Sequence, residues 1–258
     1  METISQLREI CQGTRESQIY QYNWFDRNVL RRLSIYITRL CLLMGITANQ
    51  VTLLDFLWVV AAGISFAFPQ PAMWLVGIVC FYLYLQVDCV DGEIARYHAA
   101  KGNDKRPLGQ GAVFGGVVDW LVWSIVFSCM SFGLYAETGN VLVFVVGFTT
   151  VIFRYVYQDM GLMPYPILHE KGILPEMVSK VDEEPLTEPK LMSMGRAMFG
   201  VRGFLPVFLL VIILDLLLPD MAFSARYAYL ILFASAAVGG VVFKLRNVYR
   251  NGVRIERI

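Results

Sequence analysis

The chain has 258 residues, 57% of them hydrophobic, and a formal net charge of only +1. An ordinary soluble domain is roughly 45 to 50% apolar, so a soluble fold would struggle to bury this much apolar surface. The nearly neutral charge also argues against a nucleic-acid-binding protein, because such proteins usually present a strongly basic face. Composition therefore indicates an integral membrane protein.

Residues 1–50 predict a cytoplasmic segment that contains an amphipathic helix. The start, METISQLREICQ, mixes polar, acidic and basic residues and lacks the apolar core of a cleavable signal peptide. Residues 26–43 place Leu, Ile and Tyr at helical spacing, interrupted by four arginines. This pattern predicts an interfacial helix lying on the membrane, and the alternative is a helix that only packs on the bundle.

Six apolar runs follow, and each approaches the roughly 20 residues that cross a bilayer core of about 30 Å. They cover 51–68, 73–97, 109–136, 141–160, 199–218 and 222–243. The expected fold is therefore all-α and polytopic, with a six-helix transmembrane domain over 51–247 and a C-terminal tail at 248–258.

The basic residues predict the orientation, because Lys and Arg in short loops favour the cytoplasmic side. Of the 22 basic residues, 21 precede residue 51, fall within 96–106 or 154–202, or follow residue 243, which leaves only Arg226 for the other side. Both termini are expected in the cytoplasm. The proline-containing stretch 161–198 is expected to be a cytoplasmic loop that covers a site.

Three aspartates inside the predicted spans indicate a metal site. An Asp at the centre of a membrane helix costs about 2.5 to 3.5 kcal/mol, so each one needs a partner. Asp88 and Asp91 lie three residues apart on one helix face, and Asp119 lies in the same half of the next helix. Oxygen ligands without a clearly placed His or Cys favour Mg²⁺ or Mn²⁺. The alternative is that these aspartates pair with Arg96 or Arg154.

These aspartates also resemble the signature of the CDP-alcohol phosphotransferase family, Asp-x2-Asp-Gly-x2-Ala-Arg, a short gap, then Gly-x3-Asp-x3-Asp. The run DCVDGEIAR from Asp88 to Arg96 matches the first half without a gap. Upstream, TANQVT at 47–52 is similar to the family's Thr-Pro-Asn-x-x-Thr, with Ala48 in place of the proline. The resemblance covers the first three predicted spans.

The second half of the signature departs from the family's pattern. If Gly115 is its glycine, Asp119 is the third aspartate and Trp123 stands where the fourth belongs. If Gly111 is its glycine, Gly115 stands at the third position and Asp119 is the fourth. We prefer the first alignment because FGGVVD at 114–119 is similar to the family's apolar-Gly-x-x-apolar-Asp run. One acidic position is missing in both.

The resemblance implies transfer of a phospho-alcohol or phosphatidyl group from a CDP-linked donor to an acceptor hydroxyl, with release of CMP. It also implies two divalent cations held by four aspartates, the last of which deprotonates the acceptor. Asp88, Asp91 and Asp119 would then bind metal, and Asp119 would keep the role of base in the second alignment. The residues that would face the nucleotide are Asn49, Thr52, Gly92, Ala95, Arg96 and Gly115. The glycines among them could instead only tighten helix packing.

Three further residues are candidates for the same site. Asp55 lies one helical turn beyond Thr52 and is a candidate substitute for the missing carboxylate, unless it forms a hydrogen bond within the bundle. Arg154 and Arg202 are candidates for binding the phosphate of an acceptor, since Arg presents a fork suited to phosphate oxygens. Arginines near helix ends also reach out to lipid head groups, which is the alternative.

The expected partners are a CDP-linked donor, a hydroxyl acceptor such as a lipid or a phosphorylated polyol, membrane lipids and a second copy of the chain in a homodimer. Two other functions stay open. The missing aspartate favours a catalytically weakened homologue that binds nucleotide or partners. A transporter is less favoured, because the polar residues gather on one side without the paired broken helices of inverted repeats.

Overall fold

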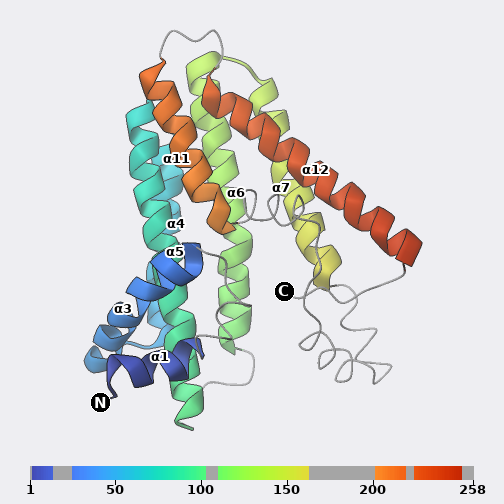
Figure 1. The fold of residues 1–258 in the computed structure, drawn as a ribbon. Helices are drawn as coiled ribbons and strands as arrows, with labels where there is room; N and C mark the ends of the chain where they lie inside the picture. The colour runs from blue at the N-terminus through green and yellow to red at the C-terminus, as the bar shows by residue number, and fades with distance from the viewer. Residues whose placement is uncertain (1, 14–24, 103–109, 163–200, 219–223, 252–258) are drawn as a thin grey trace.

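The computed structural model describes residues 2–13, 25–102, 110–162, 201–218 and 224–251. All regular elements in these residues are helices, so the predicted all-α class is confirmed for the described part of the chain (Figure 1). Most of the predicted loop 161–198 and most of the predicted tail lie outside it, while residues 161 and 162 belong to α7 and not to a loop. The elements are α1 (Ile4–Gln12), η1 (Asp26–Leu30), α3 (Arg31–Met44), α4 (Ala48–Phe66), α5 (Pro71–Ala100), α6 (Gln110–Thr138), α7 (Leu142–Leu162), α11 (Val201–Leu217) and α12 (Ala225–Asn251).

Four helices within the described residues, α4, α5, α6 and α12, are long and apolar enough to cross a membrane. Shorter apolar stretches lie in α7 (Leu142–Tyr157) and in α11 (Phe204–Leu217). The chain therefore has the helices of a membrane protein at four of the six predicted spans. Helix α12 continues to Asn251, eight residues beyond the apolar run from which it was predicted.

Helix α4 begins at Ala48, three residues before the predicted run, because Thr47 caps it. The Thr47 hydroxyl accepts a hydrogen bond from the backbone N–H of Gln50 at 3.4 Å, and the Gln50 side chain accepts one from the N–H of Thr47 at 2.9 Å. This reciprocal capping box satisfies two backbone donors at the helix start. The TANQ sequence thus has a structural role in fixing where α4 begins.

Helix α4 packs against both α5 and α6, and α5 also packs against α1, α3 and α11. Helix α7 lies against α6 and α12, while α11 lies against α5 and α12 (Figure 1). Buried aromatic rings from these helices form the core of the bundle. They include Phe66, Trp74, Phe81, Trp123, Phe127, Phe204, Phe208 and Phe233.

The elements α1, η1 and α3, here called the N-terminal unit (residues 2–13 and 25–44), pack on one end of α5. In α3 the apolar face points outward, since Leu33 and Leu40 are 48% and 54% exposed. Its polar face points inward, where Ser34 and Thr38 are fully buried. A surface helix of a soluble protein has the opposite arrangement. The buried hydroxyls of α3 therefore require polar partners within the protein.

At the other end of the bundle, the side chain of Arg226 links several helices, and it is only 1% exposed. Its guanidinium forms ion pairs with Asp215 of α11 at 2.5 Å and Glu137 of α6 at 2.7 Å, and donates to the carbonyl of Pro69 at 2.9 Å. It also lies over the Trp74 ring at 4.7 Å. This cluster ties together α6, α11, α12 and the connection between α4 and α5.

Candidate functional site

Four aspartates from three packed helices face one another. Asp55 lies on α4, Asp88 and Asp91 lie on α5, and Asp119 lies on α6. Asp55 lies near the other three carboxylates, those of Asp88, Asp91 and Asp119. Within the described residues, no three His, Cys, Asp or Glu side chains stand close enough together to enclose a metal ion. The fold therefore gathers the four carboxylates without closing them into a ligand set.

Asp55 is the most deeply buried of the four aspartates, with 2% of its surface exposed. Its Oδ1 atom has no hydrogen-bond partner among the described residues. A buried carboxylate oxygen without a partner is costly and asks for an explanation. A cation beside Asp55 would supply the missing partner, and carboxylate oxygens are the ligands that Mg²⁺ and Mn²⁺ prefer.

Thr52 connects α4 to the aspartates of α5. Its buried hydroxyl lies 2.7 Å from Oδ2 of Asp91, to which it donates a hydrogen bond. Thr52 and Asp55 are three residues apart, so they share one face of α4. The TANQVT run therefore contributes a cap at its first residue and a contact to the proposed metal ligands at its last.

Arg96 is bound to the N-terminal unit, because its Nε donates to the carbonyl of Cys11 at 2.5 Å. A Cβ atom added at Gly92 would lie 3.3 Å from Nη1 of Arg96. Gly92 thus allows the guanidinium to lie close along α5. Among the other residues expected to face the nucleotide, Asn49 lies in the first turn of α4 and Ala95 on α5, and both are partly exposed.

Gly115 and Gly116 do not serve helix packing within the described part of the chain, since a Cβ at either would meet no described atom within 4 Å. The contrast with Gly147 of α7 is clear, because a Cβ there would collide with the side chain of Ser131. As far as the described residues go, the space beside Gly115 and Gly116 is open, which is compatible with the nucleotide interpretation of Gly115.

The position that lacks a carboxylate in the preferred alignment belongs to the core. Trp123 is 2% exposed and packs against Phe127 and Phe233, with ring centroids 5.4 and 5.9 Å away. The guanidinium of Arg154 lies over the Trp123 ring at 5.1 Å. Asp119, one turn earlier on α6, is exposed, and the Tyr84 hydroxyl lies 3.5 Å from it. Residue 123 is therefore buried among aromatic rings, whereas residue 119 is exposed.

Of the two arginines proposed to bind an acceptor, the structure describes the side chain of Arg154 but not that of Arg202. The Nε of Arg154 is buried and has no hydrogen-bond partner among the described residues, while its guanidinium faces Trp123. Arg202 lies in the first turn of α11, and its side chain is outside the described part. Their role in acceptor binding stays a prediction.

Sequence reasoning missed Glu93, which lies inside the motif but at one of its variable positions. This glutamate is fully buried and accepts hydrogen bonds from Gln12 at 2.9 Å, Ser34 at 2.5 Å and Thr38 at 2.6 Å. It also forms an ion pair with Arg31 at 3.2 Å. The available signal was a third acidic residue, two positions after Asp91 in a largely apolar helix, together with hydroxyls on the predicted amphipathic helix.

Two more contacts hold the N-terminal unit on α5. Glu2 accepts hydrogen bonds from Lys101 at 2.6 Å and from the Tyr97 hydroxyl at 2.9 Å. The Lys101 ammonium lowers the pKa of Glu2 to about 2. Burial raises the pKa of the Cys11 thiol to about 12, so this cysteine stays protonated and unreactive at neutral pH.

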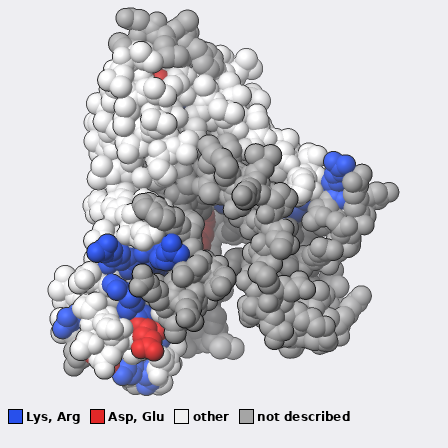
Figure 2. All heavy atoms as spheres, viewed as in Figure 1, with Lys and Arg blue, Asp and Glu red and all other residues white. Residues whose placement is uncertain are grey.

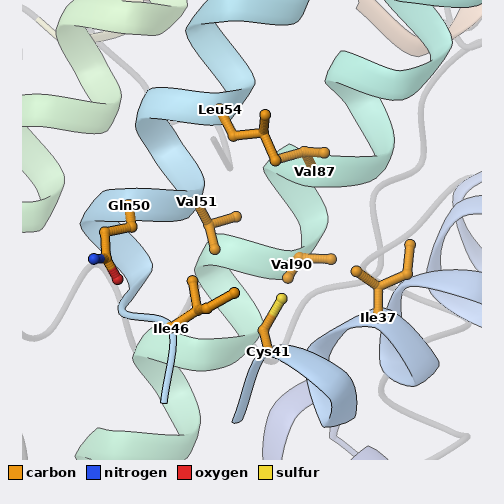
Figure 3. A pocket seen from close by; sticks show the side chains of 8 residues that line it. All are labelled: Ile37, Cys41, Ile46, Gln50, Val51, Leu54, Val87 and Val90. Atoms are coloured by element: carbon orange, nitrogen blue, oxygen red, sulfur yellow. The ribbon is translucent and has the colours of Figure 1, made fainter. Parts of the chain in front are cut away.

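An apolar groove of about 320 Å³ lies between α3, α4 and α5 (Figure 3). Its lining includes Cys41 of α3, Val51 and Leu54 of α4, and Val87 and Val90 of α5. None of the four aspartates lines it. The groove is therefore separate from the carboxylate site, although it borders the same two helices.

The chain matches no protein-family model, and no curated protein is significantly similar to it. The resemblance to CDP-alcohol phosphotransferases therefore depends on the residues of the two motifs and on where the fold places them.

Proposed function

We propose that the protein is a membrane-embedded, metal-dependent transferase that moves a phospho-alcohol or phosphatidyl group from a CDP-linked donor to an acceptor hydroxyl, with release of CMP. The observation that carries the proposal is the convergence of four aspartates from α4, α5 and α6, one of them with a buried oxygen that has no partner among the described residues. A chain that keeps such repelling carboxylates needs a function for them.

In this proposal Asp55, Asp88 and Asp91 hold Mg²⁺ or Mn²⁺ together with Asp119. A divalent cation would neutralise the charge that develops on the phosphate oxygens and improve CMP as a leaving group. Asp55 supplies the carboxylate that Trp123 cannot. The residues proposed to face the nucleotide are Asn49, Thr52, Gly92, Ala95, Arg96 and Gly115.

Asp119 is the proposed base for the acceptor hydroxyl. It is the most exposed of the four aspartates, and a base must reach the proton that it takes. Asp55, which is 2% exposed, suits a ligand better than a base. Arg154 and Arg202 are proposed to bind the phosphate of an acceptor such as a lipid or a phosphorylated polyol.

The membrane arrangement is also part of the proposal: α4, α5, α6, α7, α11 and α12 form six spans, with both termini in the cytoplasm. Figure 2 shows charged side chains gathered around the N-terminal unit and a second basic group at the end of α12, with an almost uncharged surface over the upper part of the visible bundle. The outward apolar face of α3 supports an interfacial helix in contact with lipid. A homodimer is kept as an expectation.

A second candidate function is a weakened homologue that binds a CDP-linked nucleotide without efficient turnover. The specific observation in its favour is Trp123, because a buried indole has no oxygen to coordinate a divalent metal ion and does not act as a base. This candidate shares the donor site and differs only in the rate of transfer.

The test is to measure Mn²⁺ binding, CDP binding and CMP release for purified protein in lipid nanodiscs. Asp91→Asn should abolish metal-dependent CDP binding while the protein stays folded. Asp55→Asn should weaken Mn²⁺ binding, because it removes the carboxylate that is proposed to replace the one missing at Trp123. Unchanged Mn²⁺ affinity in both variants would remove the metal site. Tight binding without CMP release from any CDP-linked donor would favour the second candidate.

A further inference from the structure

Glu93 links the N-terminal unit to the helix that carries Asp88 and Asp91. Its Oε1 atom accepts from Gln12 of α1 and from Ser34 and Arg31 of α3, while Oε2 accepts from Thr38. Hydrogen bonds to a charged acceptor are roughly twice as strong as those between neutral groups. One fully buried side chain of α5 thus holds two separate helices of the N-terminal unit.

The contacts of the N-terminal unit follow one side of α5. Glu93, Tyr97 and Lys101 are spaced by four residues, so they lie on one face of the helix. Tyr97 and Lys101 bind Glu2, as described above. Asp91 is two residues from Glu93 and therefore points to roughly the opposite side of α5. There it receives the hydrogen bond of Thr52 from α4.

This end of α5 is consequently held from two sides, by the N-terminal unit and by α4. A helix held on one side only can rotate or slide, and either movement changes where its carboxylates point. Removing a group that hydrogen-bonds directly to a metal ligand costs roughly 10- to 100-fold in metal affinity, and we expect a loss in the same range when the whole helix that carries two ligands can shift. Glu93 is the residue of α5 that accepts hydrogen bonds from both α1 and α3.

We infer that Glu93 is a positioning residue of the proposed metal site: through it the N-terminal unit fixes the rotation and depth of α5, and so the direction of Asp88 and Asp91. The inference rests on the proposed function, because it assigns Glu93 to the same site. It extends that function by making the N-terminal unit part of the site as well as a membrane contact.

The test compares Glu93→Gln with Glu137→Gln in nanodiscs, by Mn²⁺ titration, thermal midpoint and hydrogen exchange. Each variant removes the carboxylate partner of a buried arginine, Arg31 in the first case and Arg226 in the second. Because the Arg226 cluster lies at the other end of the bundle, Glu137→Gln controls for lost stability. Thr38→Val removes the donor to Oε2 and is a milder second variant, should Glu93→Gln fail to fold.

The expected result is a roughly 10- to 100-fold loss of Mn²⁺ affinity in Glu93→Gln, a smaller loss in Thr38→Val, and unchanged affinity in Glu137→Gln despite a lower thermal midpoint. Hydrogen exchange should rise over residues 88–97 only in the Glu93 and Thr38 variants. Equal Mn²⁺ affinity in all three variants, or equal losses in all three, would overturn the inference.

Failure of the proposed function has a different signature. In that case the wild-type protein binds Mn²⁺ no better than Asp91→Asn, whatever the Glu93 variants do. Hydrogen exchange then decides whether Glu93 fixes α5. Unchanged exchange over residues 88–97 in Glu93→Gln would show that Glu93 does not hold this helix in place.

Discussion

The Thr52 hydroxyl of α4 donates a hydrogen bond to the carboxylate of Asp91 of α5 at 2.7 Å. The two residues come from two separate stretches of sequence, each of which resembles a motif of the same family. Their contact places the start of α4 against the aspartates of α5. It is a direct physical link between the two stretches and is consistent with a shared site.

Thr52→Val should weaken metal-dependent CDP binding by about 10-fold. A hydrogen bond to a charged group contributes about 1.5 to 3 kcal/mol, and only part of that lost energy reduces the free energy of binding. Thr52→Ser keeps the hydroxyl and is the matched control, with binding within about twofold of wild type. Calorimetric titration with CDP and Mn²⁺ measures both. Equal affinities for the Val and Ser variants would show that the contact does not serve the site.

The helical class and the positions of the aspartates were predictable from sequence because they depend on local patterns. Apolar runs of about 20 residues indicate spans, and a spacing of three places Asp88 and Asp91 on one face. The capping box at Thr47 is also visible in the sequence, but hydrophobicity alone predicts a helix that begins at residue 51. Capping residues precede the apolar run and extend the helix.

The interactions of Glu93 and of Arg226 could not be derived from local patterns. Each depends on which helices become neighbours, and hydrophobic periodicity does not specify that in a bundle of apolar helices. The burial of Trp123 is a similar case. Sequence shows that an aspartate is missing there, but only the packing of α6 against α11 and α12 shows that the indole belongs to the core.

Topology gives a prediction that is independent of chemistry. In a background without the five native cysteines, a cysteine at Asn140 should react with a membrane-impermeant reagent added outside intact cells, because the adjoining turn is expected on the outer side. A cysteine at Gly252 should react only after the cells are opened. Equal protection of both positions, or the reverse pattern, would contradict cytoplasmic termini.

Trp123→Asp should destabilise the protein, since replacing a large buried aromatic side chain by a small one costs about 3 to 5 kcal/mol before any charge is buried. Trp123→Phe keeps an aromatic ring against Phe127 and Phe233 and should lose much less. The thermal midpoints of both variants measure this difference. Because Asp55 already supplies the missing carboxylate in our proposal, Trp123→Asp should not tighten Mn²⁺ binding. A stable Trp123→Asp protein with tighter Mn²⁺ binding and faster CMP release would show that the site had simply lost a ligand.

Gly115→Asp tests which alignment of the second motif is right. The variant should fold, because a Cβ at residue 115 meets no described atom within 4 Å, and the same holds for Gly116→Asp as a control. Gly115 has the four-residue spacing from Asp119 that the second motif requires, whereas Gly116 is three residues from Asp119 and lies on the other side of it around α6. A carboxylate at residue 116 therefore adds the same charge near Asp119 without standing at the position of the motif. If Trp123 marks the missing position, both variants should bind Mn²⁺ with affinities within about threefold of each other, since neither restores a ligand and each adds one similar charge. Mn²⁺ titration and CMP release measure the outcome. A gain of both in Gly115→Asp, absent from Gly116→Asp, would assign the missing aspartate to residue 115 and make Asp119 the fourth.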